Sequence, residues 1–417
     1  RAGIVTDRPT HSFPKWGPRG PFRVYSWTQT AVSGFGVLVA AVLLVVGFVP
    51  QATVLLALVG ALGLKTGADL PLWTQVGAGW AHLVNNLGSE PHDRGSSLEV
   101  GAYRVGEREM GLVRDGRRVV AAMRLSPRFN HWLASNDELE VYSDDWMRVL
   151  SSIPSTVDRI QILTLLQPTR ASGHRSDVLG AAKAAIASRS RQITTYLIVR
   201  LKEPIEDDET AGRIAHETLQ HLGGQLPQEL VAAEILSPLD WNTLLANCSA
   251  TELPNRVRWD HVEVDEHLES ALWVWDWPHR PTLTGFLSPL LTLDVESRIS
   301  LTIEPLDPEP RQRVLDYAYR RAESALATAT GAKHRKRAEL ETLDRQLTEL
   351  NAGHIPARAL LTISVSAATR VSVDEAVRAV KSKATACHSR VDIAGGHQAA
   401  FLDSSLPLCR GVDRSPL

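Results

Sequence analysis

RIQILTLLQPTRASGHRSDVLGAAKAAIASRSRQITTYLIVRL, residues 159–201, decides the fold class of this chain. Residues 159–167 and 192–201 are rich in apolar side chains and predict two strands. The alanine-rich residues 178–191 between them predict a helix. Strands that alternate with helices indicate a layered body, so we expect an α/β or α+β fold.

The residues on either side continue this pattern. Apolar and polar residues alternate through residues 98–125 around Asp115-Gly116, a pair that favours a tight turn between two strands. Residues 146–153 predict a helix. Further along the chain we expect helices at 207–222 and 226–236 and strands at 256–264 and 270–277.

Residues 310–352 form a long helical segment with two apolar stripes. The first stripe comprises Leu315, Ala318, Ala322, Ala325 and Leu326, and the second comprises Leu340, Leu343, Leu347 and Leu350. Because Thr330-Gly331 lies between the stripes, the pattern allows either a hairpin of two helices or one continuous rod.

The C-terminal part predicts a compact βαβ unit. It comprises a strand at 357–366, a helix that runs from a capping box at Ser372 and Glu375 to Ala386, and a strand near Val391.

Composition places the chain among ordinary folded proteins. Of its 417 residues, 22% are charged and 44% are hydrophobic, and the formal net charge is −2. Neither disorder nor bulk affinity for nucleic acid follows from these totals. Cys248, Cys387 and Cys409 are odd in number and far apart, which favours a reducing compartment over a disulfide framework.

Residues 31–64 contain no charged residue and are too long for one membrane span. Pro50-Gln51 divides them, so they predict a two-span transmembrane hairpin within residues 31–70. Basic residues flank both sides, which predicts a multi-pass protein of the cell inner membrane with both termini in the cytoplasm. A cleaved signal peptide and a buried or re-entrant hairpin are the alternatives.

The predicted organisation has five parts. A cytoplasmic arm (1–30), the hairpin (31–70) and a linker (71–98) precede an α/β domain with an N-terminal β-hairpin (99–255) and a second domain (256–417) that contains the long helical segment.

No enzymatic chemistry is predicted. The chain has no G-x-x-x-x-G-K-[ST] motif and no G-x-S-x-G elbow. Asp260, His261, Glu263, Asp265 and His267 are metal-ligand types at close spacing, but Asp265-Glu266 favours a turn, and a solvated strand edge is the preferred interpretation. The basic residues 333–337 favour a solvated helix end over a phosphate site. No cofactor, metal or catalytic residue is therefore predicted.

Residues 256–410 contain, in order, ALWVWDWP, GFLSPLL, SRISLTIEPLDPEPRQRVLDYAYRRAES, LLTISVSAATRVSVDEAVRAVKSKATA and HQAAFLDSSLPL. This order resembles the N-terminal domain of the CagE/TrbE family of conjugation and type IV secretion ATPases. The double apolar run near the N-terminus resembles the PrgI type of small membrane protein. Together the resemblances imply an actinobacterial conjugative-element protein that lacks the motor domain, and the family's hexamers imply a possible homo-oligomer.

The predicted function is a non-catalytic membrane component, a scaffold that docks a separate secretion or conjugation motor ATPase and other membrane subunits. The candidate docking residues are Trp273, Trp275, Trp277, Leu340, Leu343, Leu347 and Leu350, whose alternative role is internal core. Two further functions stay open: the front part of a split or truncated secretion ATPase, and a membrane-anchored binding module unrelated to secretion. Contact with DNA is undecided.

Overall fold

The computed structural model describes residues 98–106, 108–127, 149–150, 152–168, 191–202, 205–226, 231–250, 256–277, 287–327, 333–351 and 356–411. The strands are β1 (Leu98–Val105), β2 (Arg108–Asp115), β3 (Arg118–Pro127), β4 (Val157–Pro168), β5 (Arg191–Leu201), β6 (Val231–Ile235), β7 (Arg256–Val257), β8 (Val262–Val264), β9 (His267–Asp276), β10 (Ser297–Pro305), β11 (Ala357–Ala367) and β12 (Arg390–Ile393). The helices are α6 (Asp208–Gln225), α7 (Pro238–Asn247), α8 (Pro308–Ala327), α9 (Lys333–Asn351), α10 (Arg370–Ala386) and α11 (Gln398–Ser405), with a 3-10 helix η1 (Ser288–Thr292).

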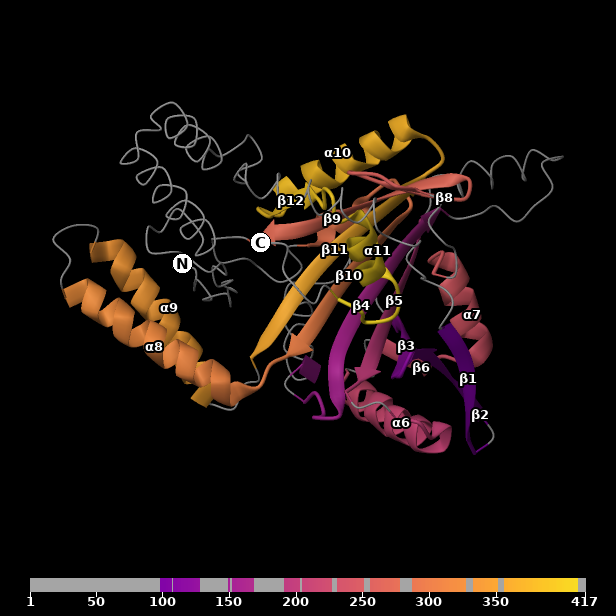
Figure 1. Ribbon diagram of the computed structural model, residues 1–417, viewed down its shortest axis with the longest axis horizontal. Coiled ribbons are helices and arrows are strands. Elements are labelled where there is room, and N and C mark those ends of the chain that lie inside the picture. The colour runs from indigo at the N-terminus through magenta and orange to yellow at the C-terminus, as the bar shows by residue number, and fades with distance from the viewer. Residues whose placement is uncertain are drawn as a thin grey trace, which may run out of the picture.

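These strands form one 12-stranded sheet in which each neighbouring pair runs antiparallel. The order is β1-β2-β3-β5-β4-β10-β11-β9-β8-β7, with β6 beside β3 and β12 beside β9. Figure 1 shows the long strands β4, β5, β10 and β11 side by side at the centre of the sheet. The predicted mixed body of helices and strands is confirmed, and its sheet is antiparallel.

The order of elements reveals an internal duplication. β1-β2-β3-β5-β4 on one side corresponds to β7-β8-β9-β11-β10 on the other, and α6, β6 and α7 correspond to α10, β12 and α11. Equivalent backbone bonds join these elements, because Leu236 N donates to Ala122 O at 3.0 Å and Ala394 N donates to Ala271 O at 3.0 Å. The two halves meet where β4 pairs with β10.

Each half contains a split βαβ unit. β5 and β6 both flank β3, and β11 and β12 both flank β9, so a helix connects two strands that are separated by a third. This arrangement is typical of ferredoxin-like folds. The predicted C-terminal βαβ unit is present in this split form, and its helix begins one turn earlier than predicted, because Thr369 caps it and accepts a bond from Ser372 N.

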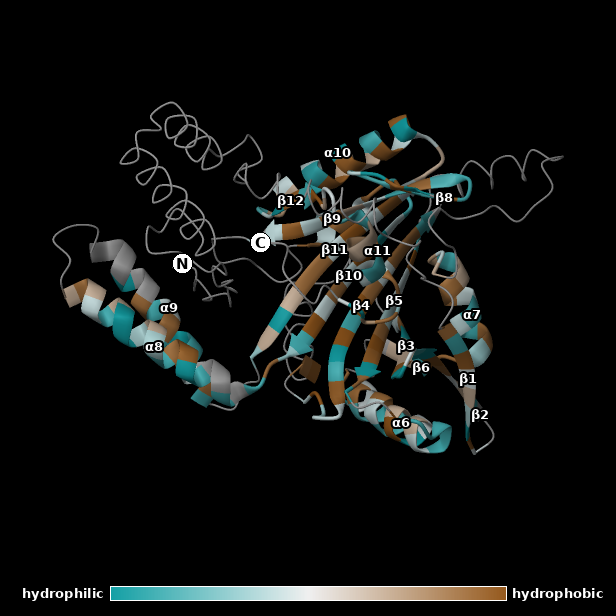
Figure 2. Cartoon of the chain, in the orientation of Figure 1, coloured by the Kyte–Doolittle hydropathy of each residue, from teal (hydrophilic) through white to brown (hydrophobic). Residues whose placement is uncertain are grey.

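Helices cover both faces of the sheet. α6 and α10 pack on one face, with Leu219 and Leu222 in one core and Val373 and Val380 in the other. The strand register places these two cores on the same face, because Ile162 in β4 lies opposite Leu301 in β10. α7 and α11 cover the other face. Hydrophobic residues run along the central strands between them (Figure 2).

The helical hairpin α8–α9 is inserted between β10 and β11. Figure 1 shows it extending away from the sheet, and the two helices pack on each other without substantial contact to other described elements. Of the two alternatives for residues 310–352, the hairpin is therefore confirmed.

Other local predictions had mixed outcomes. The turn at Asp115-Gly116 is confirmed, with Gly116 at a φ of +61°. The prediction of a helix at 226–236 is wrong, because residues 231–235 form the strand β6. This strand pairs with β3, and the pairing outweighs the preference of its alanines for a helix. The helix predicted at 178–191 lies outside the described residues.

The predicted membrane topology requires correction. Within the described ranges, no helix is long and apolar enough to cross a membrane. The fold class with a transmembrane hairpin and the location as a multi-pass inner-membrane protein are therefore not supported, and we set both aside. The residues on which they rested, 31–70, lie outside the described part of the chain. An uncharged run can be read from composition alone, whereas a spanning helix is a property of the folded chain.

Candidate docking site

The three tryptophans predicted as a docking face do not share one face. Trp273 lies in β9, half-buried against Phe401 of α11, with ring centroids 5.6 Å apart and planes at 48°. The guanidinium of Arg390 lies 5.7 Å from the centroid of Trp275. Trp277 follows the last residue of β9 and packs on the opposite face, in the α10 core. The alternation of side chains along β9 sets the face on which Trp273 and Trp275 lie. It does not apply to Trp277, because β9 ends at Asp276.

The predicted leucines lie on the side of α9 that faces α8. Leu340, Leu343, Leu347 and Leu350 are each half-buried. The matching stripe of α8 comprises buried Leu315 and half-buried Ala318, Ala322, Ala325 and Leu326. At the base of the hairpin Gln312 Nε2 donates to Asn351 Oδ1 at 3.3 Å. The two stripes meet inside the hairpin, where they hold it together.

The outer face of α8 carries exposed large side chains that the sequence pattern did not single out. Val314 is 56% exposed and Tyr317 is 69% exposed. They lie three residues apart, and exposed Arg321 lies four residues beyond Tyr317, so all three share one face of the helix. Each precedes a member of the inward stripe by one residue, about 100° around the helix. We call Val314, Tyr317 and Arg321 the α8 outer face.

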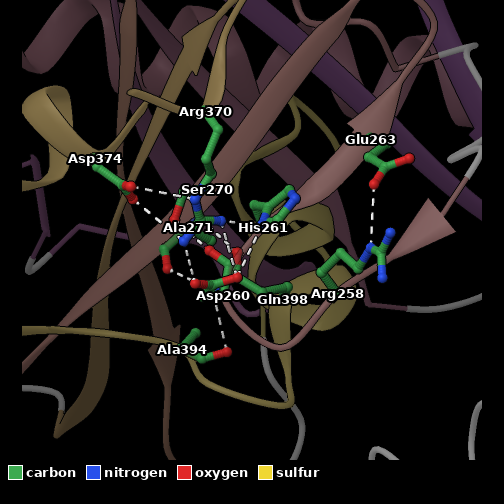
Figure 3. Close-up of polar contacts among 10 residues, drawn as sticks. All are labelled: Arg258, Asp260, His261, Glu263, Ser270, Ala271, Arg370, Asp374, Ala394 and Gln398. Carbon is green, nitrogen blue, oxygen red and sulfur yellow. Dashed lines mark hydrogen bonds and ion pairs between the residues drawn. The ribbon is translucent and has the colours of Figure 1, made fainter. Parts of the chain in front are cut away.

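The predicted metal-ligand types are held in ion pairs and hydrogen bonds instead (Figure 3). Arg370 donates to both carboxylate oxygens of Asp260, at 3.0 Å to Oδ1, and Asp260 Oδ1 lies 2.8 Å from His261 Nδ1. Glu263 pairs with Arg258 at 3.1 Å. Asp265 adopts a φ of +44° in the tight turn between β8 and β9, which confirms the predicted turn. In the described part of the chain no three such side chains converge to hold a metal ion.

A hydrogen bond from Arg370 lowers the pKa of Asp260 to about 2, and His261 adds to this effect. Because the folded-state pKa lies below the ordinary value of 3.8, the ion pair stabilises the fold above about pH 4 and loses this effect as the pH falls toward 2.

We expect Asp260→Asn to unfold at a lower urea concentration than the parent at pH 7. The loss in free energy of unfolding should be no more than about 1 kcal/mol, because the ion pair is partly exposed. The difference should shrink at pH 3, because Asp260 is then largely protonated in the unfolded parent while it stays ionised in the folded parent. Urea unfolding midpoints at pH 7, 5 and 3 measure this. A difference that persists unchanged at pH 3 would contradict the assignment.

A buried polar cluster joins the two halves of the sheet. Arg298 in β10 donates to Glu269 Oε2 at 2.7 Å and to Ser364 Oγ at 2.9 Å, and it also donates to the carbonyl of Cys248. Burial alone would raise the pKa of Glu269, but Arg298 and His267 outweigh it and hold this pKa below its usual value. The cluster fastens the segment after α7 to the second half of the sheet.

A second buried cluster makes the reciprocal connection. Gln161 in β4 donates to Ser300 Oγ at 2.7 Å and to Leu406 O at 2.8 Å, and its Oε1 accepts from Cys409 N at 3.0 Å.

Burial raises the pKa of Cys409 to about 12, and that of Cys248 also to about 12, so neither thiol is activated as a nucleophile.

A hollow of about 820 Å³ lies between the β1–β2 turn and the start of α7. Its lining comprises Arg104, Gly106, Glu109, Ser237, Pro238 and Leu239. The charges of Arg104 and Glu109 pair with each other at 3.5 Å, so the hollow presents little uncompensated charge to a ligand.

The fold and the hairpin together define a class: an internally duplicated α+β protein with one antiparallel sheet and an inserted helical hairpin whose outer face is exposed. No protein-family model matches the chain, and no curated protein matches it.

Proposed function

We propose that the protein is a non-catalytic docking component that receives a separate motor ATPase on the outer face of α8. The single observation that carries this proposal is the exposure of Val314 and Tyr317 on one face of an inserted hairpin. The kind of partner comes from the resemblance of residues 256–410 to the N-terminal domain of the CagE/TrbE family.

The hairpin geometry supports docking on this face. The apolar stripes of α8 and α9 are used between the two helices, so Val314 and Tyr317 have no evident packing role inside the hairpin. Fully burying an apolar side chain of this size contributes about 1.5–3 kcal/mol, which a partner would supply. Tyrosine and arginine are also the residue types that most often dominate binding energy, and Tyr317 and Arg321 lie side by side on this face.

Trp273 and the leucines of residues 340–350 are weaker candidates for the docking site than the α8 outer face. Trp273 contacts Phe401, and the leucines face α8, so a partner would have to open packed contacts to reach them. The α8 outer face requires no such rearrangement.

We expect the double variant Val314→Ser and Tyr317→Ser to lose at least tenfold in affinity for a motor ATPase, with a change in unfolding free energy within about 0.5 kcal/mol because both side chains are exposed. The tagged protein should first recover an ATPase that carries a Walker A motif. Binding of that purified ATPase to each variant is then measured by interferometry.

A matched control is Leu239→Ser with Val371→Ser, since these side chains are 75% and 66% exposed and lie on α7 and α10. The control should bind as the parent does. The proposal fails if no Walker ATPase is recovered, or if the α8 variant binds it with parental affinity.

A further inference from the structure

β1 forms one margin of the sheet, and its outer edge has no neighbouring strand in the described ranges (Figure 1). It pairs with β2 along all eight of its residues without a bulge, and it contains neither proline nor lysine. Natural proteins commonly shorten or interrupt such edges, because unpaired backbone groups invite pairing with another chain. The second half of the sheet does so, since its corresponding margin consists of β7 with two residues and β8 with three. β1 is therefore a long edge where its counterpart is short.

The register of β1 with β2 shows which backbone groups point outward. Ala102 lies opposite Gly111. The N–H of Gly111 donates to Leu236 O at 2.7 Å, and its carbonyl accepts from Trp241 Nε1 at 3.0 Å. Both bonds point away from β1, so Ala102 and Gly111 form a non-hydrogen-bonded pair, and such pairs alternate with hydrogen-bonded ones along an antiparallel ladder. The N–H and C=O groups that face away from β2 are consequently those of Leu98, Val100, Ala102 and Arg104.

The centre of this edge is open to solvent. Gly101 and Ala102 are exposed. Glycine has no side chain and alanine has a single methyl group, so much of this exposed surface is backbone. A Cβ added at Gly101 would meet no atom within 4 Å, which shows that no other side chain stands over the middle of β1. A strand laid beside β1 would meet no obstruction there.

Glu99 gives the edge a charge that the described residues do not neutralise. Its side chain is exposed and lies opposite Arg114 of β2. Arg114 instead donates to Asp208 Oδ1 at 2.8 Å and to Ile205 O at 2.8 Å. Within the described ranges Glu99 forms no ion pair. A basic side chain on the outer side of β1, directly opposite Glu99, would therefore be favoured.

A second copy of the chain does not match this charge. A two-fold axis that pairs β1 with β1 of another copy runs perpendicular to the sheet, so opposed residues lie on the same face and are both odd-numbered or both even-numbered. Glu99 would then lie opposite an odd-numbered residue, and β1 has no basic residue at an odd position. A different polypeptide is free of this constraint.

We propose that β1 binds an extended segment of a partner protein, which adds to the sheet as an antiparallel strand with a basic side chain opposite Glu99. The outward backbone groups of β1 supply the hydrogen bonds of this complex, and the charge of Glu99 sets its register. Antiparallel pairing is the geometry of every neighbouring pair in the sheet. This site and the α8 outer face are built from different elements, so neither proposal depends on the other.

The test uses the full chain and a fluorescent peptide that copies residues 108–115 of β2, because this sequence places Arg114 opposite Glu99. Binding is followed by anisotropy at protein concentrations up to about 0.5 mM, where weak complexes are still populated. Ala102→Pro removes one outward N–H and no bond to β2, so it should keep the parental urea midpoint and bind the peptide at least tenfold more weakly. Ala102→Val is the matched control, because it retains the N–H, and it should bind as the parent does.

A charge exchange tests the register. Glu99→Lys should weaken binding about two- to fivefold, and a peptide that carries Arg114→Glu should restore it. This exchange still decides if the proline variant fails to fold, since a loss that the altered peptide does not restore contradicts the register.

Three outcomes would overturn the proposal. An absence of peptide binding by the parent is the first. Binding that survives Ala102→Pro in the folded protein is the second, because the peptide would then replace β2 on the inner side of β1. The third is a dimer of the parent, detected by sedimentation, that Ala102→Pro dissociates, because the edge would then belong to a second copy.

Discussion

Arg298→Met is expected to lower the free energy of unfolding by about 3–5 kcal/mol. Arg298 and Glu269 are 7% and 4% exposed, and their side chains are joined at 2.7 Å. Removing the guanidinium leaves a carboxylate in the core without its cation and strips a donor from the carbonyl of Cys248. Urea unfolding of the purified protein, followed by tryptophan fluorescence, measures the change.

Two further variants separate the lost charge pair from the lost packing. Arg298→Met combined with Glu269→Gln should recover a large part of the stability, because the stranded charge is then gone. Arg124→Met removes an arginine whose ion pair with Glu234 is exposed, and it should cost no more than about 1 kcal/mol. A cost below about 1 kcal/mol for Arg298→Met would refute the structural role of the pair.

Trp241→Ala is expected to cost about 3–5 kcal/mol, the range for removal of a large buried aromatic side chain. Trp241 is 0% exposed, and it packs among Leu244, Leu245 and Val113 beneath α7. Its Nε1 donates to Gly111 O at 3.0 Å. The loss would therefore combine a cavity with an unsatisfied carbonyl, and thermal and urea unfolding both report it.

Trp241→Phe is the matched variant, because it keeps most of the ring and removes the indole donor. We expect it to cost roughly half as much as Trp241→Ala or less. A Cβ added at Gly111 would lie 2.5 Å from Trp241 Cδ1 and 2.8 Å from the backbone atoms Pro238 N and Ser237 C, so removing the ring relieves only part of the overlap. Gly111→Ala should therefore also destabilise the fold, and the double change Gly111→Ala with Trp241→Ala should cost less than the sum. Additive costs would contradict this contact.

The two halves of the sheet depend on each other at their common border. The segment after α7 is bound by Arg298 of the second half, and the segment after α11 is bound by Gln161 of the first half. Arg410 continues the second of these connections, since it pairs with Asp115 at the end of β2 with two bonds of 2.8 and 2.9 Å. These bonds add to the pairing of β4 with β10, which joins the duplicated halves into one continuous sheet.

Local signals in the sequence located most of the elements correctly. The tight turn at Asp115-Gly116, the helix α6 and the two stripes of the hairpin follow from residue spacing alone, because each depends on neighbours within a few positions. The short strand β6 was assigned to a helix, because its alanines favour helices and its pairing partner β3 lies about 110 residues away in the chain.

The duplication was missed for a similar reason. Its halves share the order of elements and the position of a two-residue turn, at Asp115–Arg118 and at Val264–His267, but not an evident repeat of residues. Order in a sheet is set by pairing between distant strands, and a single sequence does not display that pairing.

The sequence by itself determined the periods of the helices and strands and the turn at Asp115-Gly116, because these are properties of adjacent residues. Only the tertiary structure decided that the sheet is antiparallel and duplicated, that Trp277 leaves the face of Trp273, and that the predicted leucines face α8 while Val314 and Tyr317 face outward. The physical reason is that burial and pairing depend on contacts between residues far apart in the chain, whose energies outweigh local preference.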